Sequence, residues 1–224
     1  MNTDVNVIRL LGAAQLVVFV ASMLSERLLT SAVGPGKMSD ILVSIPENLT
    51  RMRISNLVAL VNSLAIVVLA VLFYIVFNEQ YKVIALVALG WWLAEAITLA
   101  VSKIGAYALI PLSRKFVEAG APESSYFQTL GDFLYYGVDR QGYDIHMLFF
   151  CLGGILWYYL LYTSGYVPRA LSVWGLAAVC LLSIPVLFLL YDRDFLSRPV
   201  MIMGLPYAPY ELFLGVWLII KGFK

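Results

Sequence analysis

Seven polar side chains that could bind a ligand or move a proton lie inside or at the edges of strongly apolar stretches of this sequence. They are Glu26, Asn62, Ser63, Glu95, Asp144, His146 and Glu211. An ionisable group inside a lipid bilayer is energetically costly and is by default a candidate for function. A carboxyl group within the bilayer, such as that of Glu95, can anchor a ligand or carry a proton, or it can simply form a hydrogen bond between packed helices. Both interpretations stay open at this point.

Residue counts place Glu95 level with two of these side chains. Glu95 lies about 15 residues beyond the polar turn 78–82, which is roughly 23 Å of helix. The same count backwards from that turn reaches Asn62 and Ser63. In an antiparallel pair of helices, Glu95 can therefore face either of them.

Two further groups fall at a similar depth. His146 lies roughly 29 Å of helix before the turn at Gly165, and Glu26 lies roughly 26 Å after Arg9. Measured from the side of the chain termini, both groups lie in the far half of the bilayer, as Glu95 does. The sequence therefore predicts one polar cavity that opens away from the termini.

Asp144 and Glu211 complete the predicted cavity. Asp144 and His146 are two residues apart, so they lie on different helix faces. Both are at the end of an apolar stretch, where interfacial polar residues are ordinary. Glu211 lies roughly 15 Å from the end of its helix, near mid-depth. Arg51 and Arg169 lie at the ends of apolar stretches, and we predict that they anchor helices at the membrane interface.

No motif in the sequence points to a metal, a cofactor or a catalytic group. Catalytic zinc usually takes three protein ligands, commonly His, and the chain holds one His. No Gly-Xaa-Ser-Xaa-Gly elbow and no phosphate-binding loop occurs, and a lone His at the edge of a span is a poor haem ligand. We therefore predict no metal site, no cofactor and no catalytic residue.

The two cysteines invite one structural hypothesis. Cys151 and Cys180 are almost equidistant from the turn 163–169, so in an antiparallel hairpin they lie at the same depth. A disulfide is conceivable if the two side chains face each other. The preferred interpretation is two small, separate thiols inside the hydrocarbon.

Transmembrane helices are the elements that must position these groups. The chain is 62% hydrophobic and 13% charged, whereas soluble domains are about a quarter charged. An apolar stretch of about 20 residues is long enough to cross a bilayer. We predict an all-α fold, a single transmembrane domain over residues 1–224. Its six spans are expected at 7–29, 54–77, 83–102, 142–162, 167–191 and 204–220.

Three connections carry their own signals. Pro46-Glu47-Asn48 predicts the start of the helix that leads into the second span. After the third span, residues 103–140 form the longest connection. Within it, a start signal at 122–124 precedes apolar residues at helical spacing, which predicts an amphipathic helix before the fourth span. That helix either lies on the bilayer or packs on the bundle. Its apolar residues are Phe127, Leu130, Leu134 and Val138.

An even number of spans places both termini on one side of the cell membrane. A plain count of Lys and Arg in the connections favours termini outside. Tight turns with one basic residue each, and the absence of a cleavable signal after Arg9, favour termini inside. We expect a multi-pass protein with cytoplasmic termini. A net charge of +1 gives no electrostatic case for nucleic acid.

Several segments resemble one family of bacterial membrane proteins, domain-of-unknown-function family 4386. The most specific is the turn Ser164-Gly165-Tyr166-Val167-Pro168-Arg169, preceded by Tyr143-Asp144-Ile145 and Leu148-Phe149-Phe150. The ending Glu211-Leu212 and Trp217 to Gly222 is also similar. One departure is that family members carry a His after the Phe-Phe pair, where this chain has Gly153. The resemblance implies a helical membrane fold and brings no activity with it.

Two functions from different classes follow from these residues. The first is non-enzymatic: binding of a lipid or small apolar ligand, or service as an accessory subunit of a membrane assembly or a homo-oligomer. The alternative is an intramembrane enzyme or a proton-coupled transporter that uses Glu95, His146 and Glu211. A catalyst or transporter needs these groups to converge on an accessible cavity, whereas a packing subunit needs them paired and inaccessible.

Overall fold

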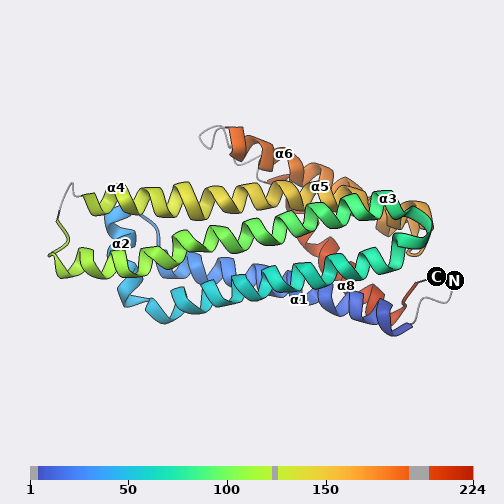
Figure 1. Ribbon diagram of the computed structural model, residues 1–224, viewed down its shortest axis with the longest axis horizontal. Coiled ribbons are helices and arrows are strands. Elements are labelled where there is room, and N and C mark those ends of the chain that lie inside the picture. The colour runs from blue at the N-terminus through green and yellow to red at the C-terminus, as the bar shows by residue number, and fades with distance from the viewer. Residues whose placement is uncertain (1–4, 123–125, 192–201, 224) are drawn as a thin grey trace. The chain divides into compact units, whose positions relative to one another are not determined.

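The computed structural model describes residues 5–122, 126–191 and 202–223, and every element within these ranges is a helix. Figure 1 shows the helices in chain order. They are α1 (Val5–Val33), α2 (Met38–Glu47), α3 (Leu49–Glu118), α4 (Tyr126–Asp132), the π-helix η1 (Phe133–Arg140), α5 (Gln141–Ser164), α6 (Arg169–Tyr191) and α8 (Tyr207–Ile220).

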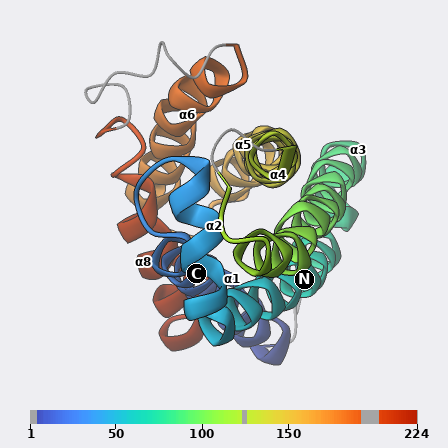
Figure 2. The same ribbon diagram turned by 90° about the vertical axis from the view of Figure 1, so that its left-hand side faces the viewer.

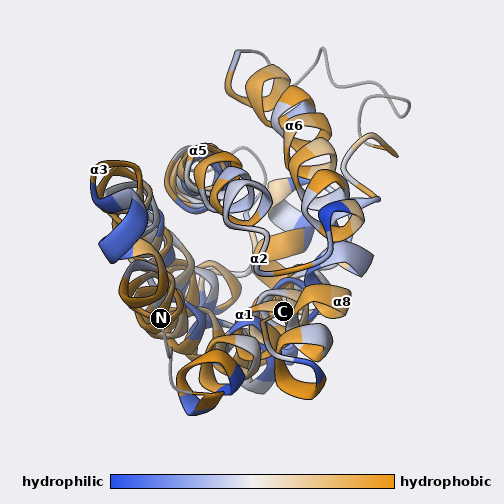
Figure 3. Ribbon diagram, turned by 90° about the vertical axis from the view of Figure 1, so that its right-hand side faces the viewer, coloured by the Kyte–Doolittle hydropathy of each residue, from blue (hydrophilic) through white to orange (hydrophobic). Residues whose placement is uncertain are grey.

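The helices are those of a membrane protein. Four helical stretches are long and apolar enough to cross a bilayer, and α8, with 14 residues, is a shorter apolar helix. Hydrophobic residues dominate the ribbon in Figure 3. Many large apolar side chains face outward, among them Leu64 at 69% and Val83 at 75% exposure, which is expected where lipid rather than water is the solvent. The four stretches are Val5–Val33, Leu49–Glu118, Tyr126–Ser164 and Arg169–Tyr191.

Helix α3 doubles back at the predicted turn. Tyr81 leaves the helical region with φ −133° and ψ 41°, and this kink separates two limbs. The limbs run side by side in Figure 1, and Phe73 of the first limb meets Trp92 of the second edge to face at 5.6 Å. The second limb continues as a helix to Glu118, so the expected connection 103–140 begins as a helix. The end of the membrane span at residue 102 stays a prediction. Lys103 does not end the helix because its charge is paired: its Nζ lies 2.7 Å from Asp139.

The predicted amphipathic helix is not a separate element. Helices α4, η1 and α5 follow one another without a gap from Tyr126 to Ser164. Residues 123 and 124 of the expected start signal lie outside the described residues. Phe127 is 7% exposed and packs edge to face against Phe116 at 5.9 Å. This segment is therefore packed on other helices, which was one of the two expected placements.

Helix α2 was missed by the sequence prediction. Pro46 lies in its last turn rather than at a helix start, and α3 begins only at Leu49. Asn48 separates the two helices because its φ of −112° and ψ of 29° are not helical. In Figure 2, α2 lies toward the viewer, and it packs against α4. Its buried face, Met38, Ile41, Leu42 and Ile45, joins an apolar core that includes Leu109 and Phe116.

By its internal contacts the chain divides into two compact units. The first consists of Met1–Phe19, Leu64–Ala96 and Asp144–Lys224, and the second of Val20–Ser63 and Ile97–Tyr143. The core of the second unit is the apolar cluster around α2. The first unit has an aromatic core, in which Phe73 stacks on Trp157 at 5.1 Å and Trp92 lies 5.9 Å from Trp157.

Candidate functional site

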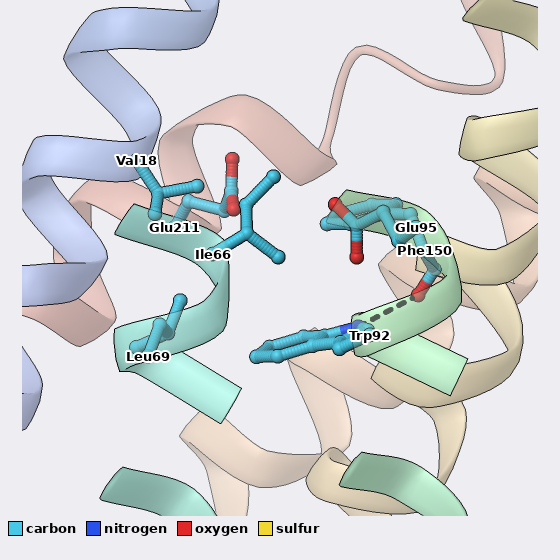
Figure 4. A pocket seen from close by; sticks show the side chains of 7 residues that line it. All are labelled: Val18, Ile66, Leu69, Trp92, Glu95, Phe150 and Glu211. Carbon is cyan, nitrogen blue, oxygen red and sulfur yellow. Dashed lines mark hydrogen bonds between the residues drawn. The ribbon is translucent and has the colours of Figure 1, made fainter. Parts of the chain in front are cut away.

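Two of the predicted acids, Glu95 and Glu211, line the same small pocket of the first unit. Glu95 comes from the second limb of α3 and Glu211 from the second turn of α8. Figure 4 shows them on opposite sides of Ile66. The cavity volume is about 10 Å³, room for a single water molecule. Its other walls are apolar or aromatic: Val18, Ile66, Leu69, Trp92 and Phe150.

Glu211 accepts hydrogen bonds from one side chain of another helix, α1, and from one side chain of its own helix, α8. Gln15 of α1 donates from Nε2 to Glu211 Oε1 at 2.9 Å, and Tyr207 donates to the same oxygen at 3.4 Å. The hydroxyl of Tyr207 also hydrogen-bonds the hydroxyl of Tyr158 in α5. All four side chains are buried. One carboxylate oxygen is therefore an acceptor at the centre of a polar network that joins α1, α5 and α8.

Glu95 is far less satisfied. Its side chain is buried, with the residue 2% exposed, and its Oε2 has no hydrogen-bond partner in the described part of the chain. The indole of Trp92, one turn earlier, donates instead to the carbonyl of Phe150 at 3.2 Å, the bond drawn in Figure 4. Burying a polar group without a partner costs roughly 1–3 kcal/mol. Glu95 is thus a group that the fold holds in place at a cost.

Gly153 explains how Trp92 reaches this position. A Cβ atom added to Gly153 would overlap the indole of Trp92 and would lie 2.6 Å from its Nε1. Only glycine leaves room for the ring, which is 2% exposed and packs in the aromatic core. A side chain at position 153, such as the His expected from the resemblance, cannot coexist with this placement of Trp92. The glycine at position 153 is therefore explained by its contact with the indole of Trp92.

Asp144 and His146 are also in the first unit, in the first turns of α5. Both are buried, at 5% and 4% exposure. Glu95 is one turn beyond Trp92 in α3, and His146 is one turn before Phe150 in the antiparallel α5. The two residues therefore lie on the same side of the Trp92–Phe150 hydrogen bond. The residues that line the small pocket include neither Asp144 nor His146.

The other three predicted cavity residues belong to the second unit. Asn62 and Ser63 are buried in the first limb of α3, where Ser63 donates to the carbonyl of Ala59 at 3.2 Å. Glu26 of α1 is half-buried and forms an ion pair with Arg140 at 2.8 Å. Glu95 and Glu211 thus share a pocket, and a single cavity that includes all seven residues stays a prediction.

A buried charge cluster in the second unit was missed at the sequence level. Asp139 receives Lys103 on one carboxylate oxygen at 2.7 Å and Arg140 on the other at 2.9 Å. Arg140 then reaches Glu26, and its guanidinium lies over the ring of Tyr143 at 5.1 Å. The negative charges of Asp139 and Glu26 balance the positive charges of Lys103 and Arg140. The signal was available, since Asp139 and Arg140 adjoin an apolar segment, but their partner Lys103 is 36 residues away.

The remaining predictions have simple outcomes in the structure. Arg51 and Arg169 are both exposed at helix starts, a placement that suits interfacial anchors. Cys151 is buried, Cys180 is exposed and both are free thiols, so the conceivable disulfide is not formed. Among the described residues, no group of three or more His, Cys, Asp or Glu is arranged to hold a metal ion.

A second, larger pocket lies in the first unit between α6 and α8. Its volume is about 240 Å³. One polar atom, Trp217 Nε1, is buried at this helix face and has no hydrogen-bond partner in the described ranges. The lining is otherwise apolar: Pro168, Ala170, Leu171, Trp174, Phe213 and Trp217.

Comparison with known proteins identifies the family and nothing more specific. No curated protein and no solved structure matches the chain. One family model, Domain of unknown function (DUF4386), matches residues 10–222. That range holds both pockets, the charge cluster and the turn at Gly165. Since the match covers nearly the whole sequence, the chain belongs to the family described as Domain of unknown function (DUF4386).

Proposed function

We propose that this protein is a six-pass membrane protein that binds the acyl chain of an anionic lipid in the pocket between α6 and α8. The six passes are α1, the two limbs of α3, the α4–α5 stretch, α6 and α8, with both termini on the cytoplasmic side. The observation that carries the proposal is the apolar pocket of about 240 Å³.

The pocket suits a segment of hydrocarbon. Pockets for drug-sized ligands occupy about 300–1,000 Å³, so this smaller volume fits part of an acyl chain. Its walls are aliphatic side chains and the rings of Trp174, Phe213 and Trp217. Phe213 is 56% exposed, so the pocket is open beside this ring to the outer face of the helices. A lipid in the surrounding bilayer can therefore enter sideways without crossing water.

The polar end of the pocket suits a lipid headgroup. Pro168 and Ala170 of the lining flank Arg169, an exposed cation. Lys221 follows Trp217 by four residues and lies on the same face of α8. A phosphate near these two cations is favoured electrostatically. The unpartnered Nε1–H of Trp217 can donate to an ester carbonyl of the same lipid.

Quenching of tryptophan fluorescence by brominated lipid tests the proposal. The purified protein in maltoside detergent is titrated with phosphatidylglycerol that carries bromine on its acyl chains. We expect quenching that saturates at one lipid per protein, because Trp174 and Trp217 both line the pocket. Ala170→Trp, which fills the pocket, should abolish the saturable phase, and Arg169→Gln should weaken the binding of phosphatidylglycerol more than that of phosphatidylcholine.

The control is Ala177→Trp, since Ala177 is an exposed alanine of the same helix that does not line the pocket. It should leave the saturable phase in place. Quenching that rises in proportion to lipid, without saturation and equally in Ala170→Trp, would show ordinary solvation by lipid. In that case the pocket would be better explained as a contact for a helix of another subunit. This outcome would favour the role of an accessory subunit.

A further inference from the structure

We propose that Glu95 and Glu211 form an intramembrane proton-binding pair that exchanges one proton through a single water molecule in the pocket between them. This inference does not depend on lipid binding, because it concerns another pocket and other residues. It assigns a site to the two acids that line the small cavity of the first unit.

The surroundings of Glu95 require a neutralising species. No Lys, Arg or His is among the residues that line the pocket, and the wall is otherwise formed by apolar and aromatic side chains. An isolated carboxylate in such surroundings is so costly that the group takes up a proton instead. Glu95 lines this cavity and is 98% buried, and its Oε2 has no hydrogen-bond partner among the described residues. A proton on Glu95 needs an acceptor there.

The surroundings of Glu211 make it the opposite partner. Gln15 and Tyr207 both donate to its Oε1. Such donors stabilise the charged form of a carboxyl. By contrast, Oε2 of Glu95 has no donor among the described residues. The two environments are therefore unequal: one carboxyl is suited to hold the proton and the other to accept it. This is the arrangement in which paired acids take different roles.

The pocket has the size for the transfer step. A volume of about 10 Å³ holds one water molecule, which needs polar partners on its walls. In the step, the O–H of Glu95 gives its proton to the water, and the water gives one of its own protons to the carboxylate of Glu211. Glu95 becomes the anion and Glu211 becomes neutral, so charge and atoms balance. One water is conserved.

The titratable groups near Glu95 and Glu211 could in principle take part in the proton exchange. Glu95 and Glu211 interact electrostatically with a thiol and with phenols from α5 and α8, and His146 is at the nearby level of α5. The thiol and phenols are Cys151, Tyr158, Tyr207 and Tyr210. None of these groups is a fixed cation. The two carboxyls therefore remain the groups that exchange the proton in this pocket.

Labelling with dicyclohexylcarbodiimide tests the inference, because this apolar reagent adds to protonated carboxyls inside membranes. The full-length protein is reconstituted in phosphatidylcholine vesicles and the labelled peptide is found by mass spectrometry. We expect one adduct on Glu95, lost in Glu95→Gln. In Glu211→Gln, which removes the proton acceptor, the rate of labelling at Glu95 should rise severalfold. Glu79→Gln, at an exposed position of the α3 turn, should change nothing.

An infrared measurement tests the same protonation without the labelling reagent. The carbonyl band of a protonated carboxyl should be present in the wild type, should lose the contribution of Glu95 in Glu95→Gln, and should be shifted in Glu211→Gln. Glu211→Asp, which keeps a carboxyl at the acceptor position, should restore a band near the wild-type frequency. The inference is overturned if neither the adduct nor the band is found. It is equally overturned if Glu211→Gln leaves both unchanged, since Glu95 is then a lone neutral acid.

Discussion

Lys103 Nζ lies 2.7 Å from Asp139 Oδ1, and the two residues are 4% and 0% exposed. Lys103 is inside α3 and Asp139 is near the end of η1. The helices come this close because Gly105 has no side chain: an added Cβ would lie 2.9 Å from the Cβ of Val138 and 3.0 Å from the backbone nitrogen of Asp139. The ion pair therefore fixes the register between α3 and the π-helical segment.

Removal of one partner of this pair should strongly destabilise the protein. Lys103→Met leaves the carboxylate of Asp139 buried with Arg140 as its remaining partner, and the loss of one partner of a buried pair costs about 3–5 kcal/mol. Unfolding by SDS in mixed micelles, followed by tryptophan fluorescence, measures the loss. The double variant Lys103→Met with Asp139→Asn should recover part of it.

Lys115→Met is the matched control, because Lys115 is an exposed lysine of the same helix. It should leave the unfolding midpoint within error. Equal effects of the two single variants would mean that the Lys103–Asp139 contact contributes no specific stability.

The same pair shows why sequence patterns predicted the helices but not all their ends. Long apolar stretches are sufficient to place α1, both limbs of α3, α5, α6 and α8, because hydrocarbon solvent forces the backbone to satisfy its own hydrogen bonds. The predicted span ends just before Lys103, and a lone charge inside an apolar stretch is costly. The partner that removes this cost is 36 residues away, and no local pattern reveals such a contact.

The candidate site shows the same limit. Hydropathy singled out Glu95 and Glu211 as costly residues, and helix rise gave a depth for each, but depth does not define which helices are neighbours. Gln15 carries no charge and was not among the predicted cavity residues, and its bond to Glu211 joins residues 196 positions apart. The pocket at α6 and α8 had no sequence signal beyond its tryptophans, since an apolar pocket and an apolar packing face have the same composition.

Substitution at Gly153 should disturb the aromatic core of the first unit. Gly153→Ala places a methyl group against the indole of Trp92, and overpacking of this kind costs about 1–3 kcal/mol. The displaced ring should also lose its hydrogen bond to Phe150. We expect a lower unfolding midpoint in SDS together with a shifted tryptophan emission maximum.

Gly90→Ala is the control for this prediction, since nothing lies within 4 Å of a Cβ added there. It should leave the stability unchanged or raise it slightly. A Gly153→Ala variant as stable as the wild type would show that the indole of Trp92 does not occupy this position.

Both cysteines should react as free thiols. Cys151 is buried and Cys180 is exposed on the outer face of α6. After denaturation in SDS without reductant, N-ethylmaleimide should add twice to the wild type and once to Cys180→Ser, as counted by mass spectrometry. Absence of adducts until a reductant is added would reveal a disulfide and would require α5 and α6 to rotate.

Three stacked rings predict which connections share one side of the membrane. Tyr166, in the turn between α5 and α6, lies 5.6 Å from Phe77 near the α3 kink and 4.6 Å from Phe223 after α8. These contacts gather the α3 turn, the α5–α6 turn and the C-terminal end of the described chain at one end of the first unit. The second limb of α3 then runs for roughly 55 Å, more than the thickness of a bilayer, before it ends at Glu118.

Single cysteines in a background with Cys151 and Cys180 replaced by Ser should report this arrangement. Gln80→Cys and Arg169→Cys should be labelled by a membrane-impermeant maleimide from the same side, and Ala119→Cys from the other side only. All three positions are exposed, so their thiols are open to the reagent. In sealed cells the first two should stay unlabelled until the membrane is opened, because we expect the termini in the cytoplasm. Labelling of Gln80→Cys and Ala119→Cys from one side would mean that the second limb of α3 does not cross the membrane.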